Sequence, residues 1–190
     1  MKRIVLISVL LCVTYLATAP TIDFRLWATR YRQMDKEAGR LMKELEFSRF
    51  IDDLGYRESA NNWLSINRIG CFGEWQFAES TLRYLGYRHI TLKKFRANPE
   101  IFPRDLQREA LKALINVNLA FLRNYQHFIG DTIGGAVITK SGMIAAAHLG
   151  GAGSVRKFLD SGGNVNRRDV LGTSIGNYMN RFSIYNLDKY

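Results

Sequence analysis

The sequence predicts a mainly α-helical single domain with one small β-hairpin, and three observations support this fold class. The chain has 190 residues, of which 47% are hydrophobic and 12% aromatic, a composition that suits a folded core. Apolar residues recur at three- and four-residue steps in several segments, which is the period of a helix. Three prolines, 16 scattered glycines and the lack of an internal repeat exclude collagen-like and low-complexity architectures.

The N-terminal segment has the residue order of an export signal. Lys2 and Arg3 precede an apolar stretch over residues 4–16, and Ala-Thr-Ala at 17–19 forms a small-residue cleavage pattern. We therefore expect residues 1–19 to be a signal peptide and the protein to be exported to the periplasm or cell envelope, or secreted. An N-terminal membrane anchor is the alternative, because a proline directly after the cleavage pattern hinders cleavage.

The net charge indicates the type of partner, and the cysteine content indicates whether a disulfide can form. The 27 Lys and Arg residues against 17 Asp and Glu residues give a net charge of +10, which favours a polyanionic partner. Export argues against nucleic acid as that partner and leaves an acidic envelope polymer. Beyond the predicted signal, Cys71 is the single cysteine, so no intramolecular disulfide is expected.

The first half of the mature chain is expected to be helix, loop and helix. Residues 20–45 predict an N-terminal helical extension to a domain of residues 46–190, because helix formers dominate from Phe24 to Leu54. Gly39 is a position where this helix could divide. Residues 61–73 contain three Asn and two Gly and predict an irregular loop.

Two further helices are expected before the C-terminal third. The segment 74–85 predicts a helix that Gly86 ends. Pro103 opens the most regular helix of the chain, since proline suits a first helical turn. Its single apolar face consists of Leu106, Ala110, Ala113, Leu114, Val117 and Phe121.

The C-terminal third predicts one hairpin and three short helices. Residues 131–139 contain Gly134-Gly135 before an apolar pair, which is typical of a small hairpin. The helices are expected over residues 143–149, 154–159 and 174–182, with Ser141 and Thr173 as the caps of the first and the last.

Glu58 is the candidate for acid–base chemistry. It ends an apolar helix, and a loop of the form Asn-x-x-Gly-x-x-Gly-x-x-Gln follows at residues 67–76. A carboxyl in that place is partly desolvated by the helices while it faces a cleft, and desolvation favours the protonated form that a glycosidic acid catalyst needs. Without a site around it, the same carboxylate would be an ordinary solvated helix end.

These residues resemble the motifs of the lysozyme-like superfamily, and within it the lytic transglycosylases of the soluble-lytic-transglycosylase type. That family carries Glu-Ser at a helix end and then the Asn-to-Gln loop, matched here by Glu58-Ser59 and residues 67–76. It also carries Ala-Ala-Tyr-Asn-x-Gly-x-Gly-x-Val, where this chain has residues 146–155 with His148 and Leu149 in place of the Tyr and Asn. The resemblance covers about residues 45–183 and implies a lysozyme-like domain.

The resemblance implies an exported peptidoglycan lytic transglycosylase. Such an enzyme cleaves the β-1,4 bond between N-acetylmuramic acid and N-acetylglucosamine and leaves a 1,6-anhydro-muramic end, with Glu58 as the sole catalytic acid/base. It implies peptidoglycan glycan strands as the partner, envelope or cell-wall proteins as further partners, and neither a metal nor another cofactor. The substrate-binding residues that it implies are Ser59, Asn67, Gln76, His148 and Tyr178.

Two alternatives stay open at this point. A hydrolytic muramidase would need a second carboxylate to activate water across the cleft, and Glu74 and Asp131 are the available candidates. A non-catalytic glycan-binding or envelope-assembly module could keep the fold without the activity, and the substitutions at positions 148 and 149 favour this alternative. The oligomeric state does not follow from the sequence.

Overall fold

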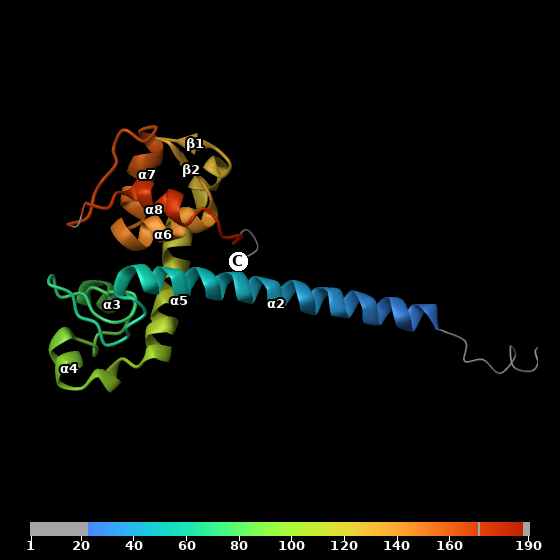
Figure 1. Ribbon diagram of the computed structural model, residues 1–190, viewed down its shortest axis with the longest axis horizontal. Coiled ribbons are helices and arrows are strands. Elements are labelled where there is room, and N and C mark those ends of the chain that lie inside the picture. Colours follow the sequence, from blue (N-terminus) through green and yellow to red (C-terminus); the bar gives the residue numbers. More distant parts are fainter. Residues whose placement is uncertain (1–22, 171, 188–190) are drawn as a thin grey trace, which may run out of the picture. The chain divides into compact units, whose positions relative to one another are not determined.

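The computed structural model describes residues 23–170 and 172–187 (Figure 1). The predicted signal peptide lies outside these residues. The chain divides into two compact units, residues 1–41 and 42–190. Across the described residues, no helix is both long enough and apolar enough to cross a membrane.

Helix α2 (Phe24–Ser59) supplies the described part of the first unit and opens the second. The carboxylate of Asp23 caps its start by accepting hydrogen bonds from the backbone N–H groups of Arg25 and Leu26, at 2.9 and 3.2 Å. The helix predicted from Phe24 is confirmed. It continues through Gly39 and ends at Ser59, so Glu58 lies at the helix end as expected.

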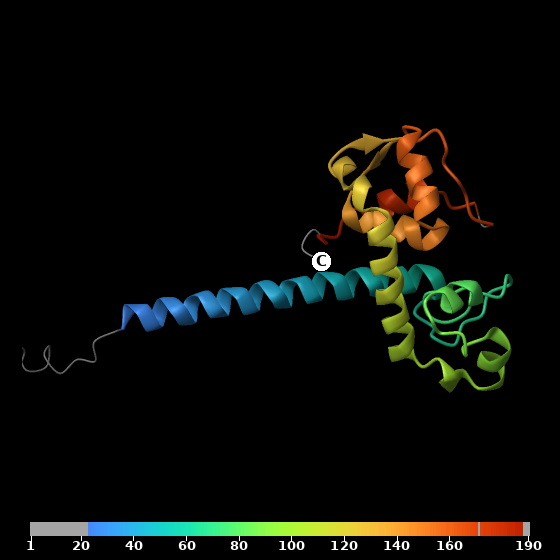
Figure 2. The ribbon, with the colours of Figure 1, turned by 180° about the vertical axis from the view of Figure 1, so that it is seen from behind.

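The second unit is mainly helical and contains one two-stranded antiparallel sheet, as predicted for the fold class. Figures 1 and 2 show α5 passing between the region of α3 and α4 and the region of α6, α7, α8 and the hairpin. The elements that follow α2 are α3 (Glu79–Tyr84), α4 (Leu92–Ala97), the 3₁₀ turn Pro99–Ile101, α5 (Arg104–Phe121), the 3₁₀ turn Arg123–Phe128, β1 (Thr132–Ile133), β2 (Ala136–Val137), α6 (Lys140–Gly150), α7 (Ala152–Asp160) and α8 (Ile175–Arg181).

Helix α6 lies at the centre of this unit. Residues 141–147 are all buried, and the helix contacts α5, α7 and α8. Gly142 allows the closest of these approaches, because a Cβ atom there would lie 2.7 Å from the carbonyl oxygen of Met179 in α8. The small residues of α6 therefore determine how closely α8 packs, and α8 carries Tyr178.

The loop after α2 is fixed to the core by a tryptophan. Trp75 is wholly buried, and its indole Nε1 donates a hydrogen bond to the carbonyl of Ile51 at 2.8 Å. Phe50, Ile51 and Leu54 of α2 are buried as well. Burial of side chains of this size contributes about 1.5–3 kcal/mol each, so the end of α2 and the following loop share one core.

The helix predicted over residues 74–85 is wrong in its first half, because α3 begins only at Glu79. Phe72 and Phe77 instead exchange two backbone hydrogen bonds, at 3.0 and 2.8 Å. Gln76, between them, has a φ of +50°, which a right-handed helix does not accommodate. A tight turn therefore occupies the segment where a first helical turn was expected.

The predicted hairpin is confirmed, with Gly134-Gly135 between its two strands. The predicted N-caps of α6 and α8 are each shifted by one or two residues. Thr139, not Ser141, caps α6 by accepting from the backbone N–H of Gly142 at 3.1 Å. The Ser141 hydroxyl is buried and donates to the carbonyl of Tyr185. Ser174, not Thr173, caps α8.

Candidate functional site

Glu58 lies in the last turn of α2, where the chain leaves the helix. Ala60 and Asn61 have φ values of +56° and +59°, and the backbone N–H of Asn61 donates to the carbonyl of Gly55 at 3.2 Å. This left-handed ending turns the chain away directly after Glu58. The half-buried Glu58 side chain lines a cavity of about 540 Å³, a volume usual for small-molecule sites.

Tyr178 of α8 holds one oxygen of that carboxyl. Its hydroxyl donates a hydrogen bond to Glu58 Oε1 at 2.5 Å, and the residue is only 3% exposed. Burial, together with the neighbouring Glu58 carboxylate, raises the pKa of Tyr178 far above its usual range, so the hydroxyl stays a proton donor. Glu58 Oε2 has no hydrogen-bond partner in the part of the chain that the structure describes, and it remains available for chemistry.

The loop over residues 67–76 forms a second wall of the cavity. Asn67 Oδ1 accepts hydrogen bonds from two backbone N–H groups of the loop, at 2.9 and 3.0 Å. Gln76 Nε2 donates to the carbonyl of Gly73 at 2.7 Å. Both side chains line the cavity. Gln76 Oε1 has no partner among the described residues and offers a ligand an acceptor, whereas the Asn67 side chain also hydrogen-bonds the Cys71 thiol.

Glycine is required at position 73 of this loop. Its φ is +85°, and a Cβ atom there would lie 2.5 Å from Gln107 Oε1 of α5. Gln107 is wholly buried, and its Oε1 accepts the backbone N–H of Glu74 at 2.6 Å. The spacing of the motif thus places the loop backbone directly against α5.

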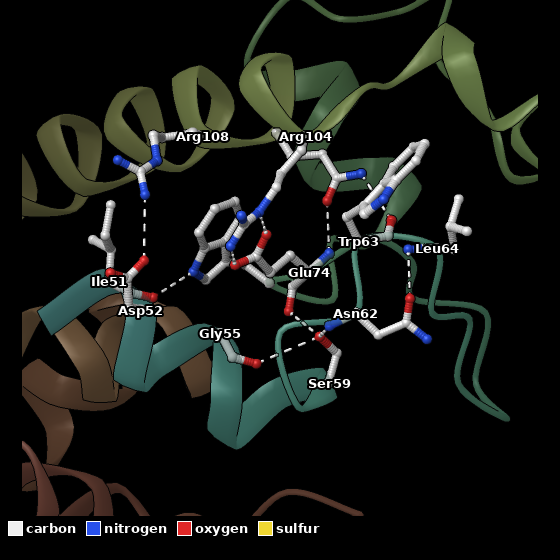
Figure 3. A network of polar contacts seen from close by, with 12 residues as sticks. Ile51, Asp52, Gly55, Ser59, Asn62, Trp63, Leu64, Glu74, Arg104 and Arg108 are labelled. Atoms are coloured by element: carbon white, nitrogen blue, oxygen red, sulfur yellow. Dashed lines mark hydrogen bonds and ion pairs between the residues drawn. The ribbon is translucent and has the colours of Figure 1, made fainter. Parts of the chain in front are cut away.

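Glu74 does not line the cavity, and its side chain points toward Arg104 of α5 (Figure 3). Its carboxylate is fully buried and accepts two hydrogen bonds from the Arg104 guanidinium, at 2.5 and 2.8 Å. Its carbonyl accepts the Ser59 hydroxyl at 2.7 Å. The Glu74 carboxylate is therefore occupied by Arg104. Ser59 joins the end of α2 to the loop and is not part of the cavity lining, so substrate contact by Ser59 stays a prediction.

His148 of α6 occupies the next part of the wall. Its Nε2 lies 2.9 Å from the carbonyl oxygen of Trp75. A carbonyl only accepts, so Nε2 carries the proton, and Nδ1 of the neutral ring is an acceptor. Nδ1 is buried and has no partner within the described residues. His148 therefore tethers α6 to the loop and lines the cavity.

The cavity wall includes residues that sequence reasoning missed. Four arginines line it against two carboxylates, Glu58 and Asp169, so the wall is predominantly basic. The Asp169 carboxylate accepts the backbone N–H of Thr173 at 2.8 Å. Asp131 is not part of the lining. No motif marks the segment before α8, which supplies Asp169, as part of a site. Among the residues that the structure describes, the lining consists of Arg57, Glu58, Asn67, Arg68, Ile69, Cys71, Gln76, His148, Leu149, Gly150, Arg167, Arg168, Asp169, Val170, Ile175 and Tyr178.

The Cys71 thiol faces the same cavity in a half-buried position. Burial is the main cause that raises the pKa of this thiol above its usual value. A hydrogen bond with the Asn67 side chain opposes this rise, and the charge of Glu58 adds to it. A raised pKa keeps the thiol protonated and weakly nucleophilic near neutral pH. The arrangement therefore favours chemistry at Glu58 over chemistry at Cys71.

No protein-family model, curated protein or solved structure matches this chain. The geometry of the cavity and the motif resemblance therefore carry the functional argument.

Proposed function

We propose that this protein is a peptidoglycan lytic transglycosylase with a lysozyme-like fold and with Glu58 as its single catalytic acid/base. The observation that carries the proposal is the Tyr178–Glu58 hydrogen bond of 2.5 Å in the wall of a cavity of about 540 Å³. The hydrogen bond fixes Oε1 and leaves Oε2 without a partner among the described residues. A carboxyl held in this way is suited to both donating and accepting a proton.

The reaction uses one carboxyl twice. Protonated Glu58 gives its proton to the glycosidic oxygen as the bond from that oxygen to C1 of the muramic residue breaks. The Glu58 carboxylate then takes the proton of the muramic 6-hydroxyl. The oxygen of that hydroxyl bonds to C1 at the same time. This step closes the 1,6-anhydro ring and returns Glu58 to its protonated state, so no water is consumed.

The polar groups around Glu58 suit a sugar substrate. The side-chain amides of Asn67 and Gln76 line the cavity, and Gln76 Oε1 offers an acceptor that a hydroxyl or acetamido N–H can satisfy. The basic lining and the net charge of +10 favour an anionic polymer such as peptidoglycan, whose stem-peptide carboxylates are negative. Export, expected from the N-terminal segment, would bring the protein to this substrate.

Product analysis tests the proposal. Purified peptidoglycan digested with the protein should give fragments that end in 1,6-anhydro-muramic residues, each lighter by one water than a hydrolysis product. Intramolecular attack has a proximity advantage that can reach effective molarities of about 10⁵ M, which favours the 6-hydroxyl over water. Mass spectrometry with and without borohydride reduction distinguishes the two ends, because anhydro ends are not reduced.

Predominantly reducing muramic ends would contradict the transglycosylase and support a muramidase. Asp169 would then be the residue to test as the second carboxylate, since it lines the cavity whereas Glu74 and Asp131 do not. Glycan binding with neither product would support the non-catalytic module.

Replacing Tyr178 by phenylalanine should lower kcat about 10- to 100-fold, because a hydrogen bond to a charged group contributes about 1.5–3 kcal/mol. The ring stays in the core, so the variant should fold, and the lost hydrogen bond should lower the midpoint of thermal unfolding by several degrees. Because its pKa is raised, the Tyr178 hydroxyl does not lose its proton at alkaline pH, and the wild-type rate should not fall near pH 10 through this group.

Tyr185→Phe is the matched control for this variant. Tyr185 also donates its hydroxyl to a carboxylate, that of Asp53, but neither residue lines the cavity. The activity of the Tyr185→Phe variant should therefore match that of the wild type. Equal losses in Tyr178→Phe and Tyr185→Phe would show that the Tyr178 hydroxyl has no particular role at Glu58.

A further inference from the structure

The part of α2 that belongs to the first unit carries an uncovered apolar stripe. Phe24, Trp27, Tyr31, Met34 and Leu41 are between 58% and 75% exposed. Large apolar side chains grouped on one face of a soluble protein mark interaction sites. The stripe therefore requires an explanation that the cavity at Glu58 does not give.

The spacing of the stripe is that of a coiled coil. Steps of three and four residues alternate from Phe24 through Trp27, Tyr31, Met34 and Ala38 to Leu41. This places Phe24, Tyr31 and Ala38 at a positions and Trp27, Met34 and Leu41 at d positions of successive heptads. A strict alternation of this kind gives a narrow seam, which fits another helix of the same pitch.

The charges beside the seam fit a second copy of the same helix. In this register Arg30 takes a g position and Asp35 takes the e position of the next heptad. In a parallel dimer a g side chain lies beside that e side chain of the partner helix. Each copy would then pair its Arg30 with Asp35 of the other. The two side chains make no ion pair within the residues that the structure describes, and they are exposed.

A lipid surface fits this helix less well. Helices that lie on anionic membranes border their apolar face with Lys and Arg. Here the acids Asp35 and Glu37 border the stripe, at e and g positions. Arg25, Arg32 and Lys36 take b and f positions on the far side of the helix, where they would point away from the lipid.

We infer that residues 24–41 form a parallel two-stranded coiled coil with a second copy of this chain. The a and d side chains bury each other in layers, and two symmetric Arg30–Asp35 pairs set the parallel direction. The inference is independent of the proposed activity, because it concerns residues outside the cavity.

Cysteine cross-linking of the full chain, expressed in its native form in a Cys71→Ser background, tests the arrangement. A parallel seam brings the two copies of position 38 face to face, within the span of a disulfide. Ala38→Cys should therefore give a disulfide-linked dimer under mild oxidation. Lys36→Cys, at an f position on the far side, is the matched control and should stay monomeric on a non-reducing gel.

Charge reversal tests the pairing independently. Sedimentation equilibrium of the full chain should show a dimer whose dissociation constant rises about tenfold in Arg30→Glu and in Asp35→Arg. The double variant restores opposite charges and should return the constant to near the wild-type value. Met34→Glu should give a monomer, because it introduces a charge at a d position.

Three results would overturn the inference. A wild-type chain that sediments as a monomer at all loading concentrations excludes the dimer. A dimer that does not cross-link through Ala38→Cys excludes the parallel register, because an antiparallel seam never places position 38 opposite itself. Binding of the monomer to anionic vesicles, abolished by Met34→Glu, would assign the stripe to a lipid surface instead.

Discussion

Replacing Glu58 by glutamine should lower the rate of glycan-strand cleavage by about 10²–10⁴-fold, the usual contribution of a general acid or base. Glutamine preserves the size of the side chain, and its amide oxygen can still accept the Tyr178 hydroxyl. It has no transferable proton, so neither half of the proposed reaction can proceed through it. The unfolding temperature should be close to that of the wild type, since the hydrogen bond and the packing are kept.

Asp131→Asn is the control for this loss. It removes an exposed carboxylate outside the cavity, with the same change in charge. Activity should then be near wild type in Asp131→Asn and almost absent in Glu58→Gln, with both measured on the same peptidoglycan preparation. Near-wild-type cleavage by a well-folded Glu58→Gln protein would remove Glu58 from the mechanism.

Local patterns were sufficient to predict most elements of this fold. The apolar steps after Pro103 predicted α5, but the buried face expected from them was wrong. Of the expected residues only Ala110 is buried and Phe121 is exposed, because the face that packs into the core consists of Gln107, Ala110, Leu111, Ile115 and Asn118. Gly134-Gly135 predicted the hairpin. Such signals depend on residues a few positions apart, and backbone preferences and helical periodicity act over that range.

Contacts between distant residues explain the differences from the sequence-based picture. Ser141 and Thr139 both suit the cap of α6, and the choice depends on Tyr185, whose carbonyl takes the Ser141 hydroxyl. The start of α3 depends on the pairing of Phe72 with Phe77, which the helical pattern of residues 74–85 does not reveal. Tertiary contacts override local propensity in both places.

Motifs identify only some residues of the candidate site, because contacts between distant residues bring the others to it. Glu58, Asn67, Gln76, His148 and Tyr178, named from motifs, all line one cavity. The segment that supplies Arg167 and Asp169 carries no motif, and its place in the wall follows only from the tertiary fold. Glu74 was a candidate base because the sequence does not reveal its pairing with Arg104, which lies 30 residues further along the chain.

That buried ion pair gives the second large prediction. Arg104→Met should lower the free energy of unfolding by about 3 kcal/mol, since removing one partner of a buried pair leaves an uncompensated charge. The Glu74 side chain is 0% exposed, and methionine keeps the apolar stem of the arginine. For a domain of this size the midpoint of thermal unfolding should fall by about 10 °C. Calorimetry or circular dichroism measures the shift.

Arg108→Met is the matched control, because Arg108 lies one turn further along α5 and also pairs with a carboxylate (Figure 3). Its partner Asp52 is 46% exposed and lies 3.3 Å away, so its loss should cost less than about 1 kcal/mol. Arg104→Met combined with Glu74→Met also removes the buried Glu74 carboxylate that Arg104→Met leaves unpaired, and it should recover most of the lost stability. Similar midpoints for Arg104→Met and Arg108→Met would show that the buried pair contributes no more than an exposed one. The loop of residues 67–76 would then owe its position to Gln107 and Trp75, which hold it independently of Arg104.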